Sequence, residues 1–216
     1  MSPLKQRFET ELETIMGGLG YKRKKGSLTF TKQISANVSW TVFFQTLPSY
    51  PIGETITYIP RVGIRYKDVD LIMRKFSESL QRKKYVLDTI STYLHNVVKE
   101  CPMHIDYRRN TDSDEFKTFI LKMVSDWANP YFEKYSDLDN LIDKFENLGI
   151  GSGSAPEIVY LPVLYYVRGY DISRGLNYIA RVQRVSSSLR EYIFPNYYIE
   201  QYKKLYELEK STELPA

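Results

Sequence analysis

The spacing of hydrophobic residues predicts one helix followed by several strands in the first third of the chain. Apolar residues recur every three or four positions from Leu4 to Leu19, which is typical of an amphipathic helix with one buried face. Apolar and polar residues then alternate around Leu28–Phe30 and along Val38–Phe44, as in strands that bury one face. A third strand is predicted over Thr55–Tyr66, where Pro60 favours an edge position or a bulge.

The middle of the chain contains both helical spacing and strand-like alternation of apolar residues. Helical spacing returns over Lys67–Leu80. The stretch Val86–Val97 fits either element, because its residues favour strands but its apolar positions also recur at helical spacing; we interpret it as extended. A further strand is predicted at Met103–Tyr107.

Two later segments begin with the polar signature of a helix start. Thr111 is followed three residues later by Asp114, and Ser136 is followed in the same way by Asp139. The residues after each signature have helical apolar spacing. Pro130 is expected to bend or stop the first of these two helices.

A glycine and serine segment at residues 149–154 is the one linker-like stretch of the chain, and helical spacing resumes after it. We therefore predict an α+β domain over residues 1–148, a linker over 149–154, and a helical region over 155–216 that packs on the first domain. The expected fold class is α+β, with an antiparallel sheet covered by helices and followed by a C-terminal helical region.

Composition supports a folded intracellular protein. Hydrophobic residues make up 43% and aromatic residues 14% of the 216 positions, which is enough for a substantial core. The single Cys101 cannot form an internal disulfide, and the charged N-terminal stretch differs from a signal peptide. No stretch approaches the roughly 20 apolar residues of a membrane span. We expect a cytoplasmic protein without a membrane partner.

The sequence lacks a recognisable catalytic or metal-binding arrangement. His95 and His104 have no further ligand at a spacing typical of zinc sites, and Cys101 has no nucleophile signature around it. The acidic pair Asp137 and Asp139 stands at a predicted helix start, where capping explains it. We therefore predict no catalytic residues, no metal, no cofactor and no enzymatic activity.

Tyrosine and acidic residues favour a protein partner. The chain has 19 tyrosines, and they are dense along the predicted last helix. Tyrosine gives a large contact area at low conformational cost and is enriched in interfaces. The residues we expect to bind a protein partner are Asp137, Asp139, Asp143, Tyr198, Tyr202 and Tyr206.

Basic clusters leave an alternative open. The net charge of +4 is small, but basic residues gather locally and could contact phosphates, with nearby aromatic rings for stacking. In this alternative the chain is a nucleic-acid-associated module. Its expected contacts are Lys22, Arg23, Lys24, Lys25, Arg82, Lys83 and Lys84.

Two motifs carry a resemblance to a known family. The Gly-Tyr-Lys-Arg-Lys-Lys turn at Gly20–Lys25 follows the opening helix, and Pro-Tyr-Phe-Glu-Lys-Tyr-Ser-Asp-Leu at Pro130–Leu138 ends a later one. With this order of elements, residues 4–146 resemble the bacterial domain of unknown function 4304, which is similar in organisation to immunity proteins of polymorphic toxin systems. The resemblance implies a non-catalytic inhibitor that occludes a toxin or effector, and it supplies no enzymatic residues.

Overall fold

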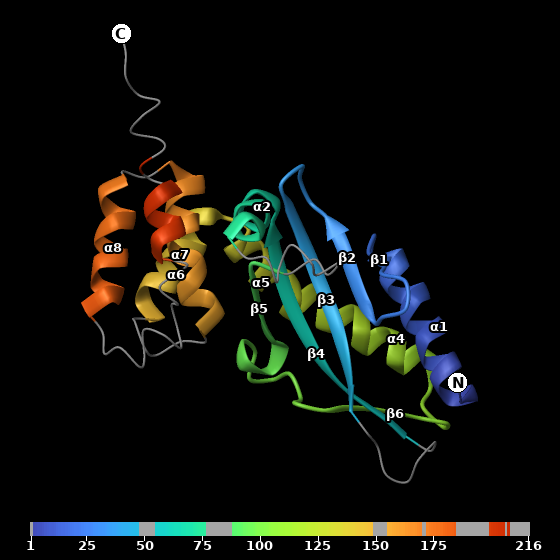
Figure 1. The fold of residues 1–216 in the computed structure, drawn as a ribbon. Coiled ribbons are helices and arrows are strands. Elements are labelled where there is room, and N and C mark those ends of the chain that lie inside the picture. Colours follow the sequence, from blue (N-terminus) through green and yellow to red (C-terminus); the bar gives the residue numbers. More distant parts are fainter. Residues whose placement is uncertain are drawn as a thin grey trace. The chain divides into compact units, whose positions relative to one another are not determined.

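The computed structural model describes residues 2–47, 55–76, 88–148, 155–169, 172–184, 199–205 and 207. It confirms the α+β class, with an antiparallel sheet in one part of the chain and helices in another (Figure 1). The chain groups into two compact units: residues 1–65 with 90–135, and residues 66–89 with 136–216. The predicted linker at 149–154 lies outside the described residues, and the division at that point stays a prediction.

The first unit is built on a six-stranded antiparallel sheet. The strands follow the order β1-β2-β3-β4-β5, and β6 also pairs with β4. Their bounds are β1 (Lys22–Arg23), β2 (Thr29–Gln33), β3 (Val38–Leu47), β4 (Thr55–Tyr66), β5 (Ile90–Tyr93) and β6 (Ile105–Arg108). The alternating patterns therefore predicted β2, β3 and β4, and β6 with its bounds shifted by one to two residues, whereas β1 lies in the stretch that was predicted as a turn. Within Val86–Val97, the described residues are extended only at β5 and then form the short 3-10 helix η1 (Leu94–Asn96).

The long strand β4 has two partners in succession along one edge. Its residues 55–58 pair with β6, and its residues 61–64 pair with β5. Pro60 falls between these two ladders, where neither strand needs an amide donor. The expected edge position for Pro60 was therefore wrong, because β4 lies inside the sheet, between β3 and the pair β5 and β6.

One face of the sheet is covered by α1 (Pro3–Gly18) and α4 (Ser113–Lys122) through a cluster of aromatic rings. The ring centroid of Phe8 lies 5.0 Å from that of Tyr58 and 5.2 Å from that of Tyr107. Phe116 of α4 packs on the same rings, at 4.9 Å from Tyr107. Four elements, α1, β4, β6 and α4, therefore share one core.

The helix after β6 begins at a different cap from the one predicted, and it is not stopped at Pro130, one of the two outcomes expected there. Its N-cap is Asp112 and not Thr111, because the Asp112 side chain accepts hydrogen bonds from two backbone amides. Pro130 does not stop the helix: α4 continues through a π-helical stretch, η2 (Met123–Ala128), into α5 (Asn129–Tyr135). The wider turn has already interrupted the regular bonding pattern before the proline, so its missing amide costs little.

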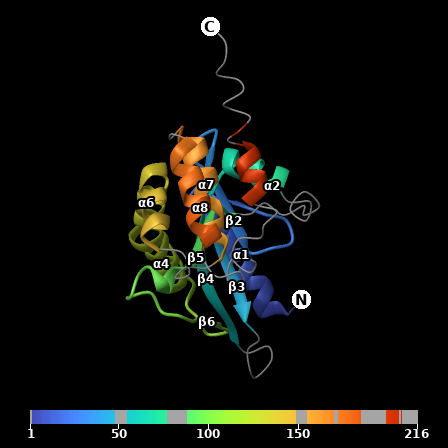
Figure 2. The same cartoon turned by 60° about the vertical axis from the view of Figure 1, so that its left-hand side comes forward.

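The second unit contains α2 (Lys67–Phe76), α6 (Leu138–Leu148), α7 (Ala155–Arg168), α8 (Ile172–Arg184) and a helical segment at 199–205. Figure 2 shows α6, α7 and α8 side by side. The core between them is apolar and includes Leu141, Phe145, Leu164 and Ile179. The described residues beyond 154 are helical apart from the turn after α7 and include no strand, as predicted.

Candidate protein-contact surface

The acidic residues proposed from the sequence are largely used within the second unit. The Asp137 side chain accepts a hydrogen bond from the Asn140 amide at 3.0 Å and caps α6. Both carboxylate oxygens of Asp139 accept from the Arg168 guanidinium, each at 2.6 Å. Asp143 is exposed. Of the three carboxylates, two therefore stabilise this helical unit.

The tyrosine prediction fails at the one position where it can be examined. Tyr202 is fully buried, and its hydroxyl lies 3.1 Å from the sulfur of Met73. Ile199 is also buried and lies one helical turn earlier, so the two residues share the packed face of this segment. Tyr202 cannot serve as an exposed anchor. Tyr198 and Tyr206 lie outside the described residues.

The basic turn after α1 is only partly available to a ligand. Arg23 donates hydrogen bonds to two glutamates of α1, at 2.5 Å to Glu9 and 2.9 Å to Glu13, and so joins β1 to this helix. The exposed members of the cluster are Lys22, Lys24 and Lys25. The second basic cluster, Arg82 to Lys84, lies outside the described residues.

Nothing in the described part of the chain resembles a metal site. No group of three or more His, Cys, Asp or Glu side chains there could hold an ion. Cys101 is buried, and burial raises the pKa of its thiol to about 11. A thiol with that pKa is protonated at neutral pH and is a poor nucleophile. None of the described helices has both the length and the apolar character needed to span a bilayer.

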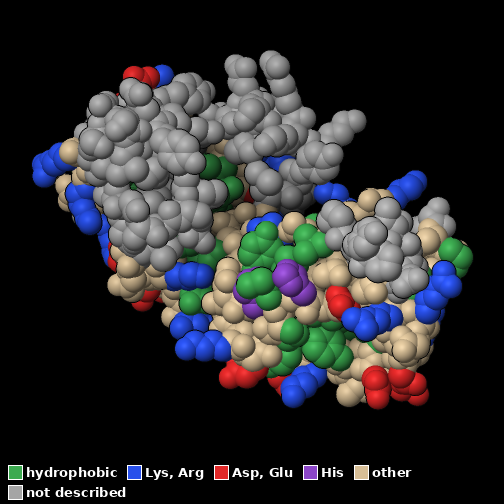
Figure 3. All heavy atoms as spheres, turned by 90° about the horizontal axis from the view of Figure 1, so that it is seen from below, with side chains coloured by type: hydrophobic (Ala, Val, Ile, Leu, Met, Phe, Trp, Pro, Cys, Tyr) green, Lys and Arg blue, Asp and Glu red, His purple; other side chains and the backbone are tan. Residues whose placement is uncertain are grey.

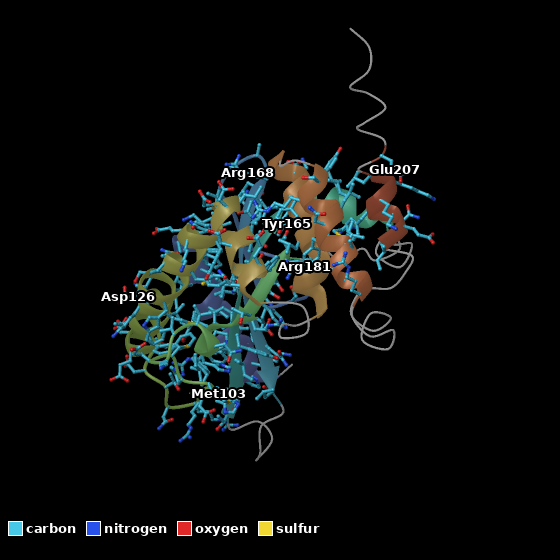
Figure 4. The ribbon with its side chains drawn as sticks, turned by 90° about the vertical axis from the view of Figure 1, so that its left-hand side faces the viewer. Met103, Asp126, Tyr165, Arg168, Arg181 and Glu207 are labelled. Carbon is cyan, nitrogen blue, oxygen red and sulfur yellow. The ribbon has the colours of Figure 1, made fainter. Side chains whose placement is uncertain are left out.

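The connection between β5 and β6, residues 93–104, exposes hydrophobic side chains, and sequence reasoning did not identify it as a candidate contact surface. Two of the four large hydrophobic side chains that are exposed among the described residues lie on it: Val97, 41% exposed, and Met103, 55% exposed. Figure 3 shows the two histidines of the chain beside hydrophobic side chains on one face, and Figure 4 labels Met103. We call the residues Tyr93, His95, Val97, Met103 and His104 the 93–104 surface.

A row of planar groups connects this surface to the sheet. The guanidinium of Arg61 lies 4.8 Å from the ring centroid of Tyr93, and the His95 ring is stacked with that same tyrosine at 5.5 Å. The Tyr93 hydroxyl donates to the side-chain oxygen of Gln45 on β3 at 3.3 Å. Residues of β3, β4 and β5 therefore hold the beginning of the 93–104 surface in place.

Arg61 brings a positive charge to this surface. Its guanidinium donates to the Ser91 hydroxyl at 3.3 Å, and its Nε is buried and finds no acceptor among the residues that the structure describes. Among the described residues no carboxylate pairs with it. A guanidinium in this situation can gain a charge-assisted hydrogen bond from a carboxylate of another molecule.

The exposure of this surface had no signal in the sequence. Val97 and Met103 belong to apolar patterns that equally suit buried positions, and only the packing of the sheet decides which side chains remain outside. Comparison with known proteins adds no assignment, since no family model, no curated protein and no solved structure matches this chain. The resemblance to the domain of unknown function 4304 stays a prediction.

Proposed function

We propose that this chain is a non-catalytic protein-binding protein whose partner docks on the 93–104 surface. The observation that carries the proposal is the exposure of Val97 and Met103 on one short connection. Single exposed apolar residues are common on folded proteins, whereas a gathering of them is typical of a contact site.

The make-up of the surface fits a protein partner. Methionine, tyrosine and arginine are enriched at interfaces; this surface exposes Met103, and its Tyr93 is stacked with Arg61. The connection joins two strands that both pair with β4, so its two ends are already ordered before binding. An ordered surface loses little conformational entropy on association, which favours affinity.

The chemistry of the surface also indicates what the partner offers. An apolar contact next to Val97 and Met103, with a carboxylate that reaches Arg61, would satisfy both features. The resemblance described above supports the finer proposal that this partner is a toxin or effector and that the chain acts as an immunity-type inhibitor. An inhibitor of this kind works by occlusion and needs no catalytic group.

The test uses the full chain as bait in an extract of its host, followed by purification of the captured protein and calorimetric titration of the two. Met103→Glu and Val97→Asp should each weaken binding roughly 30-fold, the effect of losing an anchor of about 2 kcal/mol. Ile34→Asp is the matched control, because Ile34 is also 41% exposed but lies in the turn between β2 and β3. Equal losses in all three variants, or no binding by any purified partner, would refute the proposal.

The exposure of Lys22, Lys24 and Lys25 supports the alternative function, a nucleic-acid-associated module. A fluorescent single-stranded oligonucleotide, titrated at several salt concentrations, measures it directly. We expect weak binding that a triple Lys→Ala variant changes little. Tight binding that falls steeply with salt and disappears in the triple variant would favour the alternative over a protein partner.

A further inference from the structure

The described methionines differ sharply in how much of each side chain solvent can reach. Met16 and Met123 are 0% exposed and Met73 is 3% exposed, whereas Met103 is 55% exposed. Oxidation of a thioether requires the oxidant to reach the sulfur directly. Met103 is therefore the one described methionine that a small oxidant meets at the surface without an opening of the fold.

The nearest competing sulfur along the chain is shielded. Cys101 stands two residues before Met103, but it is 3% exposed and its thiol faces the Pro102 carbonyl oxygen at 3.6 Å. Peroxide reacts with the thiolate, and burial raises the pKa of Cys101 to about 11, so little thiolate exists at neutral pH. Oxidant at this surface therefore meets a thioether before it meets a reactive thiol.

We propose that Met103 is a site of selective, reversible oxidation that weakens partner binding. A lone pair of the Met103 sulfur attacks one oxygen of hydrogen peroxide, the O–O bond breaks, the S–O bond forms and water leaves. Sulfur is oxidised by two electrons and peroxide is reduced. In the reverse direction a dithiol reductant, used by a methionine sulfoxide reductase, removes the oxygen as water and becomes a disulfide.

The consequence for binding rests on the proposed function. Methionine sulfoxide is polar and carries a strong hydrogen-bond acceptor, so it disfavours burial against an apolar partner. The fold itself is unaffected, because an exposed side chain contributes little to the core. Oxidation therefore changes the surface and leaves the scaffold intact.

The chemical part is tested on the full chain with hydrogen peroxide, intact-mass measurement and peptide mapping over time. Oxygen should add at Met103 at least tenfold faster than at Met16, Met73 or Met123, and Met103→Leu should remove this fast site. Treatment with a methionine sulfoxide reductase and dithiothreitol should reverse it. Oxidation of Cys101 or a buried methionine as fast as Met103, or failure of the reductase, would overturn the assignment.

The regulatory part is tested by titrating the purified partner into untreated chain, oxidised chain and the variant Met103→Gln, a polar residue of similar length. Oxidation and Met103→Gln should each weaken binding about tenfold, and oxidised Met103→Leu should bind like its untreated form. Selective oxidation with unchanged affinity would refute the regulation while leaving the protein-binding function in place. Unchanged affinity in Met103→Glu and Val97→Asp would instead refute that function.

Discussion

Arg61 and Tyr93 face each other directly across the β4 and β5 ladder, and the guanidinium of Arg61 lies 4.8 Å from the Tyr93 ring centroid. A cation at this distance from an aromatic face gains roughly 0.5–1 kcal/mol at a partly exposed site. The pair also fixes the first side chain of the 93–104 surface. It therefore contributes both to the stability of the sheet edge and to the order of the contact surface.

We expect a double-mutant cycle of Arg61→Met and Tyr93→Leu to give a coupling energy of roughly 0.5–1 kcal/mol in urea unfolding. The matching cycle of Arg61→Met with Ile34→Ala should give no coupling energy, because Ile34 lies in the turn between β2 and β3 and not beside Arg61 on β4. A coupling energy near zero for the first pair would mean that the stacking is incidental to stability.

Acid should weaken the attachment of α1 to the turn before α4. Burial raises the pKa of Glu11. Hydrogen bonds from Arg7 and Ser113 lower this pKa by more than burial raises it, so the pKa lies below its ordinary value of 4.5. The ionised Glu11 thus stabilises the fold above pH 4.5, and this contribution disappears as the pH falls through the lowered pKa. Glu11→Gln should unfold more easily at pH 7 and show a shallower loss of stability below pH 4.5. An unchanged acid profile would contradict this.

Of the three glycines at the end of α1, two stand at positions where a larger side chain would fit. A Cβ on Gly17 or Gly18 would meet nothing within 4 Å, whereas Gly20 has a φ of +82° and forms the turn after the helix. Gly17→Ala and Gly18→Ala should each stabilise the protein by roughly 0.4–1 kcal/mol. Gly20→Ala should destabilise it by about 1 kcal/mol or more. Thermal unfolding of the three variants checks the opposite signs.

Within the second unit, Asp139 should matter more than its neighbour Asp143. Asp139 makes a two-bond ion pair with Arg168, while Asp143 is simply exposed. Because both partners of the ion pair are themselves half-exposed, we expect Asp139→Asn to cost only about 0.5–1 kcal/mol, less at high salt, and Asp143→Asn to cost a few tenths at most. Equal effects of the two changes in denaturant unfolding would show that the ion pair adds nothing.

Removing one buried hydroxyl should stabilise the first unit. Tyr58 is fully buried, and its hydroxyl has no hydrogen-bond partner among the described residues. Tyr58→Phe should therefore raise the free energy of unfolding by about 1 kcal/mol, because an unpaired buried polar group is lost. Tyr93→Phe is the control with the opposite sign, since the Tyr93 hydroxyl donates to Gln45. A loss of stability in Tyr58→Phe would indicate a bridging water.

Local patterns predicted the strands well, because alternation along one strand records which face is buried. The predicted strand Thr55–Tyr66 coincides with β4. Where the sequence failed, the reason was a partner distant in the chain. Pro60 suits an internal strand only because two separate strands share that edge. Pro130 is accommodated after a π-helical turn, beyond which Phe132 stacks on Trp40 of β3 at 5.0 Å.

The site was harder to predict than the fold for the same physical reason. Asp139 and Arg23 both appeared available for a partner, but each finds an opposite charge on a different element: Arg168 of α7 for the first, and Glu9 with Glu13 of α1 for the second. The burial of Tyr202 and the exposure of Met103 depend on which elements pack over them. The spacing of residues along the chain predicts neither the burial of Tyr202 nor the exposure of Met103.

The shared edge of β4 has a consequence for how this protein can change over generations. The connection from β5 to β6 joins two strands that both pair with β4, so the ladders on either side keep their register whatever its length. Doubling the length of a flexible loop costs only about 0.6 kcal/mol of closure entropy. Insertions, and substitutions at exposed positions such as Val97 and Met103, can thus accumulate without loss of the sheet, whereas Leu94 and Cys101 are buried and stay constrained. The chain can then follow a changing partner while its scaffold stays constant.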